Sequence, residues 1–141
     1  MFAYSIHSFT PQDTDDAMTL WRATPGIGLS DADAPDKIAA YLERNPELSF
    51  VARSEERLIG AVLCGSDGRR GYLQHLAVAP DFRHLGIGTA LTEHCLAGLH
   101  ALGITRCHLF VISGNAGGQA FWEQIGWRPR TDLMILSKDI G

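Results

Sequence analysis

Apolar residues recur along the first half of the chain with two different periods. In short stretches they alternate with polar residues or form apolar runs, as in strands, and in two longer stretches they follow helical spacing. The expected strands are residues 3–9, 48–53, 58–64 and 72–79, and the expected helices are residues 13–23 and 35–45. The polar turn at residues 54–57 joins two of these strands as a hairpin, which the next strand extends into a meander.

The second half of the chain predicts a helix and strands in a different order. Ile87, Leu91, Cys95 and Leu99 recur at every fourth position, which is typical of a helix over residues 86–101. After it we expect a strand at residues 104–112, a helix at 116–125 and a final strand at 133–138. Strand, helix and strand in succession form a βαβ unit with parallel strands and a right-handed crossover. The order of elements therefore indicates an α/β protein with a mixed sheet.

Composition limits the size and the partners of this protein. A chain of 141 residues with 45% hydrophobic and 20% charged residues suits one domain over residues 1–141. Its formal charge of −4 argues against binding to nucleic acid or to an anionic membrane surface. No apolar run approaches the ~20 residues that span a bilayer, and the start lacks the pattern of a signal peptide. We expect a cytoplasmic protein.

Cysteine and histidine patterns give no sign of a metal site. Cys64, Cys95 and Cys107 are odd in number and lack C-x-x-C spacing, so we interpret them as small buried hydrophobic residues. The histidines contain no H-x-x-x-H pair and no adjacent set of carboxylates, which argues against a metal hydrolase. They are His7, His75, His84, His94, His100 and His108. We expect neither a disulfide framework nor a bound metal.

The sequence Arg83-x-x-Gly86-x-Gly88-Thr89 lies between an expected strand and an expected, strongly amphipathic helix. Glycines there allow close approach of the backbone to a ligand, and the free N–H groups and dipole of a helix start favour an anion. Arg83 adds charge-assisted hydrogen bonds. The pattern favours binding of a pyrophosphate group, although two glycines alone also suit a simple tight turn.

A dinucleotide-binding fingerprint fits this region poorly. That motif follows the first strand of a sheet, has a third glycine where Leu91 stands here, and places an acidic residue about 20 positions further on. Position 108 is His and its neighbours are apolar. We therefore do not expect a Rossmann-type nucleotide site.

Two segments resemble motifs of the GNAT superfamily of acetyltransferases. Residues 76–88, Leu-Ala-Val-Ala-Pro-Asp-Phe-Arg-His-Leu-Gly-Ile-Gly, closely resemble its acetyl-CoA-binding motif with the core [RQ]-x-x-G-x-[GA]. Asn115 and the run from Ala120 to Trp127 look like a later motif of the family. The resemblance implies a GNAT-type acyl-CoA N-acyltransferase fold, with a central mixed sheet of six to seven strands flanked by about four helices.

The resemblance also implies where acetyl-CoA lies. In this family the strands that match residues 72–79 and 104–112 splay apart, and the pantetheine arm lies between them. The pyrophosphate is then held by the N–H groups that precede and begin the following helix. The residues implied in acetyl-CoA binding are Leu76, Ala77, Val78, Arg83, His84, Leu85, Gly86, Ile87, Gly88, Thr89, Asn115, Phe121 and Trp122.

Catalysis of this kind requires a base for the amine. Deprotonating a lysine-like amine at pH 7 costs about 4.6 kcal/mol, and an α-amine only about 1.4 kcal/mol. The family's usual base lies on the strand before the glycine motif, where this chain offers Tyr72, Gln74 and His75. Strand alternation predicts Tyr72 and Gln74 on one face and His75 on the other. The candidates for the base are His75, for which the alternative is a packed structural histidine, and a water chain that ends on Tyr72.

The acid of the reaction is harder to identify. Members of the family usually have a Tyr in the last helix, where this chain has Trp122, and its tyrosines are Tyr4, Tyr41 and Tyr72. An indole N–H donates a hydrogen bond but does not transfer its proton. We expect Trp122 either to solvate the leaving thiolate or to pack in the core.

The function that the resemblance implies is transfer of an acetyl group from acetyl-CoA to an amine acceptor, by a monomer or homodimer. The alternative is an acyl-CoA-binding sensor or regulatory domain without turnover, which the weak base and the missing Tyr favour. Asp31, Asp33 and Asp36 are expected at the acceptor mouth, where carboxylates attract a cationic amine.

Overall fold

The computed structural model describes residues 2–141, which form a mixed α/β fold. Within these residues one sheet has five strands in the order β1-β2-β3-β4-β5, antiparallel except for the parallel pair β4 and β5. The strands are β1 (Ser5–Ser8), β2 (Phe50–Ser54), β3 (Arg57–Ser66), β4 (Gly71–Val78) and β5 (Cys107–Leu109). The helices are α1 (Thr14–Arg22), α2 (Pro35–Arg44), α3 (Ile87–Ala101) and α4 (Ala116–Gln124), with short 3₁₀ turns at Pro11–Asp13, Asp31–Asp33 and Pro80–Phe82.

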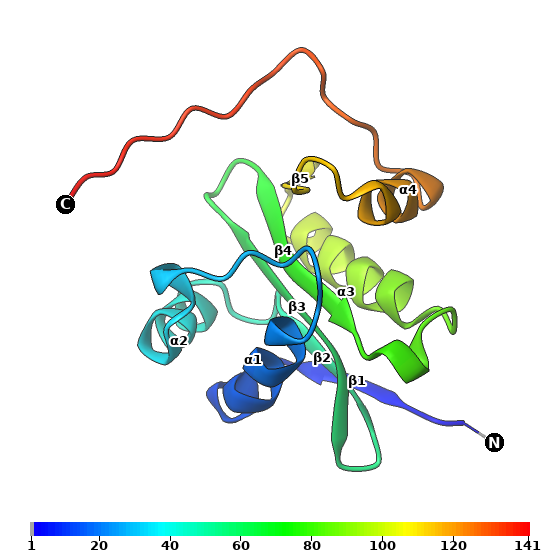
Figure 1. Ribbon diagram of the computed structural model, residues 1–141. Coiled ribbons are helices and arrows are strands. Elements are labelled where there is room, and N and C mark those ends of the chain that lie inside the picture. The colour runs from blue at the N-terminus through cyan, green and yellow to red at the C-terminus, as the bar shows by residue number, and fades with distance from the viewer. Residues whose placement is uncertain (1) are drawn as a thin grey trace.

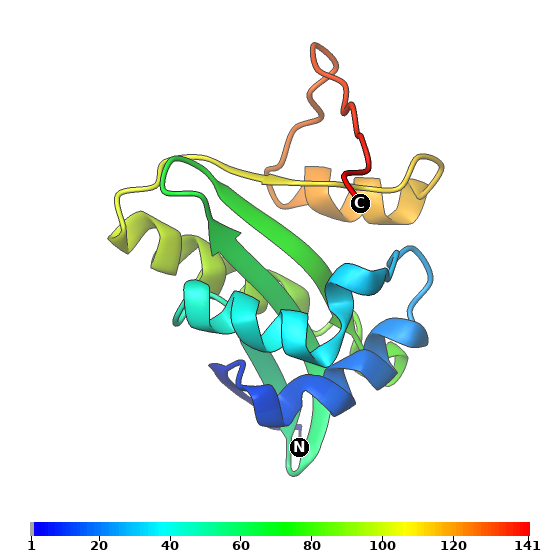
Figure 2. The same ribbon diagram turned by 90° about the vertical axis from the view of Figure 1, so that its left-hand side faces the viewer.

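Helices cover both faces of the sheet. Helices α1 and α2 lie on one face and α3 on the other, while α4 lies next to β5 (Figures 1 and 2). Leu91, Cys95 and Leu99 of α3 are buried in one apolar cluster, as their spacing predicts. Trp21 of α1 is fully buried in a second cluster on the opposite face, with Ile38 of α2. The mixed α/β architecture and its four helices confirm the expected fold class.

A β-bulge interrupts β4 at its centre. Leu63 of β3 pairs with Gln74 and Ala61 pairs with Ala77, so two residues of β4 oppose one of β3. The extra residue is His75, whose φ of 58° is in the left-handed region. A bulge bends its strand and shifts the alternation of side chains by one position.

The bulge makes one expectation wrong. His75 was expected to face away from Gln74, but its ring packs against Trp21, with ring centroids 5.2 Å apart. Gln74 lies opposite Leu63, which belongs to the same apolar cluster as Trp21. Both side chains therefore lie on the α1 face, because regular alternation fails at the left-handed residue.

Strand β5 is shorter than the expected strand over residues 104–112. Its residues Cys107–Leu109 pair with Gly71–Leu73 of β4, and no pairing continues beyond Leu73. The bulge follows two residues later in β4, so the bend prevents the two strands from staying within hydrogen-bonding distance. The chain after β5 diverges from β4 and leaves an opening between them.

The final strand expected at residues 133–138 does not form. Residues 128–141, all within the described part of the chain, contain no strand and run away from the sheet beyond α4 (Figure 1). Leu133, Met134, Ile135 and Leu136 are 61–86% exposed. A short run of apolar residues makes this segment look like a strand, but a strand also needs a partner for its backbone. The sheet therefore has five strands instead of six to seven.

Burial sets the properties of the cysteines. Cys64 and Cys95 are buried and Cys107 is half-buried, and all three are free thiols. Burial, followed by the influence of Cys64, raises the pKa of the Cys107 thiol to about 12. A hydrogen bond with Cys64, followed by burial, raises the pKa of Cys95.

Within residues 2–141, no helix has the length and hydrophobicity needed to cross a membrane.

Candidate active site

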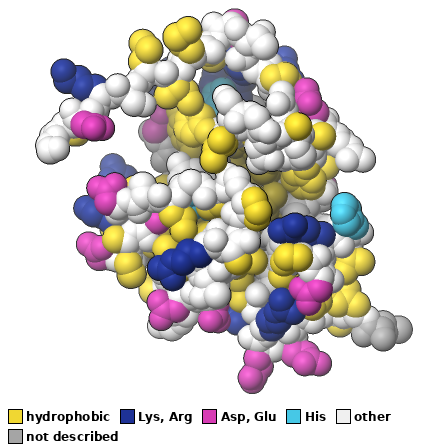
Figure 3. Space-filling view, in the orientation of Figure 1, with side chains coloured by type: hydrophobic (Ala, Val, Ile, Leu, Met, Phe, Trp, Pro, Cys, Tyr) yellow, Lys and Arg dark blue, Asp and Glu magenta, His cyan; other side chains and the backbone are white. Residues whose placement is uncertain are grey.

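A cleft of about 980 Å³ opens where β4 and β5 diverge. Its walls are the loop after α1, the bulged half of β4, the start of α3, and the chain from β5 into α4. The space-filling view shows hydrophobic side chains exposed on this side of the molecule, many of them along the C-terminal segment and around the hollow beneath it (Figure 3). A mostly apolar cleft that borders a helix N-terminus suits a ligand with both an apolar part and a charged group.

The polar end of the cleft is the N-terminus of α3. Gly86 is the N-cap residue with a left-handed φ of 84°, and the first backbone bond of the helix runs from the Ala90 N–H to the Gly86 carbonyl, at 3.0 Å. The N–H groups of Ile87, Gly88 and Thr89 have no backbone acceptor among the described residues. Three such donors and the positive end of the helix dipole form a site for an anion.

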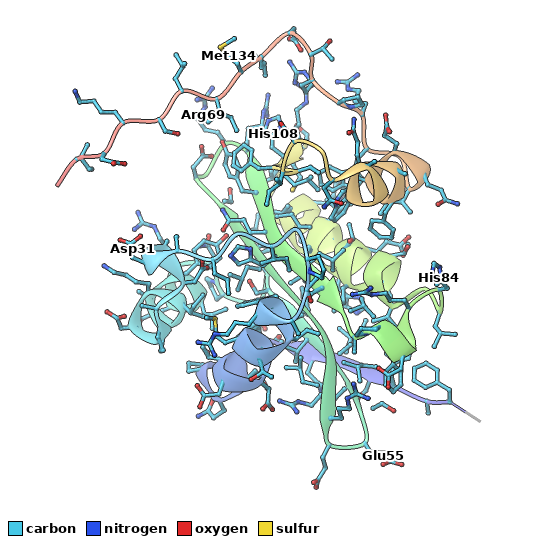
Figure 4. The ribbon with its side chains drawn as sticks, viewed as in Figure 1. Asp31, Glu55, Arg69, His84, His108 and Met134 are labelled. Atoms are coloured by element: carbon cyan, nitrogen blue, oxygen red, sulfur yellow. The ribbon has the colours of Figure 1, made fainter. Side chains whose placement is uncertain are left out.

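The loop before α3 is held by Arg83. Its Nε donates a hydrogen bond to the Val78 carbonyl at the end of β4, at 3.1 Å. His84 has a positive φ of 62°, and its side chain points away from the body of the protein (Figure 4). Leu85 is 51% exposed and does not line the cleft. Of the expected binding residues in this loop, Arg83 and His84 line the cleft, and Leu85 lies outside it.

The far wall of the cleft is the start of α4. Asn115 caps this helix, because its Oδ1 accepts a hydrogen bond from the Gly118 N–H at 3.0 Å. The Phe121 ring approaches α3 so closely that a Cβ on Gly88 would lie 3.3 Å from its Cζ. Trp122 packs edge-on against Phe121, with ring centroids 5.1 Å apart. Asn115, Phe121 and Trp122 all line the cleft, as expected.

Two glycines bring the loop after α1 against this wall. A Cβ on Gly26 would lie 2.6 Å from the Asn115 Nδ2, and the φ of Gly26 is 88°. Gly28 approaches the side chain of Ile112, which follows β5. The Gly-rich character of this loop is visible in the sequence, but its partners are about 85 residues away, and no local pattern predicts them.

His75 is held in the cleft wall by contacts of both its side chain and its backbone. Its Nε2 lies 2.8 Å from Oδ1 of Asp33, and the two side chains are 15% and 8% exposed. The Trp21 indole donates a hydrogen bond to the His75 backbone carbonyl at 2.7 Å. These contacts come from α1 and from the turn before α2, so they hold the bulge against the opposite layer of the fold.

Asp33 is a functional candidate that sequence reasoning placed wrongly. It was expected at an acceptor mouth with Asp31 and Asp36, but it is buried, and its Oδ2 accepts a hydrogen bond from the Ser30 N–H at 3.0 Å. Asp31 and Asp36 are exposed. The S-x-x-D pattern at Ser30 is a capping signal that predicts an inward Asp33.

Tyr72 lies apart from the cleft. It pairs with Gly65 of β3 and with His108 of β5, and its ring centroid is 5.9 Å from that of His108. It does not line the cleft, whereas His75 and Trp122 do. The structure therefore brings two of the three expected catalytic residues to one cavity.

Among the described residues, no group of three His, Cys, Asp or Glu side chains is arranged to hold a metal ion.

The other expected acetyl-CoA residues line the cleft. They are Leu76, Ala77, Val78, Gly86, Ile87, Gly88 and Thr89. Three of them belong to β4 after the bulge, where the strand has no β5 residue beside it. These residues stay candidates for acetyl-CoA binding.

Known proteins are similar to this chain in sequence and in fold. An acetyltransferase of Pectobacterium atrosepticum is 31% identical over 133 residues, which cover 94% of this chain and 93% of that protein. One of Sodalis glossinidius is 28% identical over 133 residues, with the same coverage.

Solved structures give the same result for the fold. The PaiA N-acetyltransferase from Thermoplasma acidophilum, in complex with coenzyme A, superposes with a TM-score of 0.79 at 20% identity, over 89% of this chain and 90% of that chain. The aminoglycoside 6′-N-acetyltransferase of Acinetobacter haemolyticus gives a TM-score of 0.78 at 18% identity, over 97% and 99%. The profile of the Acetyltransferase (GNAT) family matches residues 14–127. The chain is therefore an acyltransferase that belongs to the GNAT family of acetyltransferases.

Proposed function

We propose that this protein is an N-acetyltransferase that moves the acetyl group of acetyl-CoA to a primary amine, on a small molecule or on a protein or peptide. The observation that supports this most directly is the anion site at the start of α3, which borders a cleft of about 980 Å³ with many apolar side chains in its walls. The solved relative from Thermoplasma acidophilum contains coenzyme A.

Acetyl-CoA binding in this proposal uses two kinds of contact. The N–H groups of Ile87, Gly88 and Thr89 hold the pyrophosphate, each as a donor to a charged acceptor. The backbone of β4 after its bulge has no β5 residue beside it, so the N–H and C=O groups of Leu76 and the N–H of Val78 are available for the pantetheine amides, while the Val78 carbonyl accepts the hydrogen bond from Arg83. The apolar walls around Phe121 exclude water from the arm.

The reaction is direct attack of a neutral amine on the thioester. His75 takes a proton from the substrate ammonium, the nitrogen lone pair forms the C–N bond, and the C–S bond breaks with its electron pair on sulfur. The proton that leaves the new amide nitrogen goes to the CoA thiolate, and His75 later returns its own proton to solvent. Free CoA-SH and an N-acetyl product result.

Trp122 solvates the leaving thiolate in this scheme. It lines the cleft and packs between Phe121 and Trp127, so its orientation is fixed by two edge-on aromatic contacts. The cost of releasing a thiol of pKa about 8.5 without protonation is about 2 kcal/mol at pH 7, which hydrogen bonding can offset. Tyr72 takes no part, because it lies outside the cleft.

The competing function is an acyl-CoA sensor that binds without turnover. Both functions predict stabilisation of the fold by acetyl-CoA, so binding alone does not separate them. A panel of amines separates the two functions. Small diamines, amino acids, amino sugars and peptides with free N-termini are each incubated with the protein and acetyl-CoA, and the release of free thiol is measured. Amine-dependent release of CoA supports transfer. Stabilisation without release for every amine, under conditions that keep the protein folded, supports the sensor.

A further inference from the structure

The His75 and Asp33 side chains form an isolated pair at the inner side of the cleft. The carboxylate is almost completely buried, and it makes two contacts: Oδ1 with Nε2 of His75 at 2.8 Å, and Oδ2 with the Ser30 N–H at 3.0 Å. A buried carboxylate with both oxygens engaged has a fixed orientation. The direction of the His75 ring is thereby fixed as well.

The second ring nitrogen of His75 is open to the cleft. Nδ1 has no hydrogen-bond partner within residues 2–141. Among the described residues, every buried side-chain nitrogen or oxygen has a hydrogen-bond partner, so a ring nitrogen without one is not buried. Nδ1 is therefore accessible from solvent, and the space that it reaches is the cleft that His75 lines.

These contacts determine which nitrogen carries the proton. A carboxylate accepts hydrogen bonds but does not donate them, so the Nε2 of a neutral His75 must be the protonated nitrogen. The lone pair then lies on Nδ1, on the cleft side. A base needs this arrangement, because the nitrogen that faces the substrate must be the unprotonated one.

We infer that Asp33 is a positioning residue that fixes His75 in the Nε2–H tautomer and presents Nδ1 as the base for the acceptor ammonium. This rests on the proposed function, in which His75 removes that proton. When Nδ1 takes the proton from the ammonium, the amine becomes neutral, and the positive imidazolium remains beside the carboxylate of Asp33. The proton leaves to solvent after the C–N bond has formed.

The bulge provides the geometry for this pair. The left-handed His75 places its ring on the α1 face of the sheet, where Trp21 packs against it and the Trp21 indole holds its carbonyl at 2.7 Å. Asp33 reaches the ring from the 3₁₀ turn before α2. Asp31 of the same turn points outward into solvent (Figure 4). Asp33 is thus the acidic residue of this turn that contacts His75.

The test is Asp33→Asn, a change of similar shape that reverses the expected tautomer. The Asn carbonyl oxygen keeps the bond from the Ser30 N–H, so its NH₂ group donates to Nε2 of His75 and forces the proton onto Nδ1. We expect ¹⁵N NMR of the imidazole to show protonated Nε2 in the wild type and protonated Nδ1 in the variant. A wild-type protein with protonated Nδ1 overturns the inference, without any variant.

Steady-state kinetics of the Asp33→Asn variant test whether Asp33 contributes to catalysis. Asp33→Asn should lower kcat by about 100-fold, the lower end of what a general base contributes, while KM for acetyl-CoA and its stabilising effect stay unchanged. The loss should be larger for a lysine-like amine than for an α-amine of lower pKa. Asp15→Asn, an exposed Asp on α1, is the matched control and should keep wild-type rates.

Comparison with His75→Gln separates this inference from the proposed function. If Asp33 acts through His75, the double variant should be no slower than His75→Gln alone. A slow His75→Gln together with a fully active Asp33→Asn would refute the role of Asp33 and leave His75 as the base. A wild type that acetylates no amine would refute the proposed function, while the NMR experiment still decides whether Asp33 sets the tautomer.

Discussion

Replacing Gly88 by Leu should remove the binding of acetyl-CoA without unfolding the protein. A Cβ at this position lies 3.3 Å from Cζ of Phe121 and 3.7 Å from Cδ2 of Leu76, so the rest of a Leu side chain must extend into the cleft. It would then cover the N–H groups at the start of α3. The substitution itself favours a helix, because Leu has a higher helix propensity than Gly.

The magnitude follows from the hydrogen bonds that are lost. A bond to a charged acceptor contributes about 1.5–3 kcal/mol, so losing two of the three donors costs about 3–6 kcal/mol and weakens affinity by more than about 100-fold. Acetyl-CoA at 100 times its Kd stabilises a wild-type protein by about 2.7 kcal/mol, roughly 10 °C in Tm for a domain of this size. At the same concentration the variant should gain less than about 2 °C.

Thermal melts with and without acetyl-CoA provide the measurement. The control is Ala97→Leu, which adds the same side chain at an exposed position of the same helix, outside the cleft. S-acetylpantetheine, which lacks the pyrophosphate, should lose much less affinity from Gly88→Leu than acetyl-CoA does. A Gly88→Leu protein whose Tm still rises by about 10 °C with acetyl-CoA would refute the placement of the pyrophosphate.

Three further predictions concern other parts of the structure. Trp122→Phe keeps an aromatic ring but removes the N–H, so kcat should fall about tenfold, or about 1.4 kcal/mol, with affinity for acetyl-CoA retained; unchanged steady-state turnover would exclude the indole as donor. Gly26→Ala places a side chain at φ 88° and 2.6 Å from the Asn115 Nδ2, so chemical denaturation should show a loss of about 1–2 kcal/mol, and wild-type stability would contradict the close approach of the loop. Because the pKa of Cys107 is raised to about 12, its thiolate fraction at pH 8 is about 1 in 10,000, and labelling by a thiol reagent should be far slower in native than in urea-unfolded protein. Equal labelling rates at pH 8 would show that Cys107 is not shielded in the native fold.

Elements with strong local signals were predictable from the sequence. Helix α3 has apolar residues at every fourth position and a glycine after its end, and it forms within one residue of the expected bounds. The Arg83 to Thr89 motif was also predictable, because an anion site at a helix start depends on a short run of adjacent residues. For the same reason nearly all of the expected acetyl-CoA residues line one cleft.

Features that depend on distant contacts were not predictable. The bulge at His75 changes the face of that side chain, and it depends on Trp21 and Asp33, which are 54 and 42 residues away. The segment from Leu133 to Lys138 begins with a short apolar run that is typical of a strand, but it does not pair with β5, and a local sequence pattern cannot supply a partner. Tyr72 comes before the point where β4 and β5 diverge. It lies outside the cleft because β5 still pairs with β4 at this position, which the sequence does not predict.

The most direct test of the proposed function follows the acetyl group itself. The protein is incubated with acetyl-CoA that carries ¹³C in the acetyl group and with the best amine of the panel, and mass spectrometry measures the labelled product while free CoA is counted. The account predicts one labelled N-acetyl group on the amine for each CoA released, and no label left on the protein after denaturation. CoA release with labelled acetate as the product, or saturable binding of acetyl-CoA without any transfer, would contradict it.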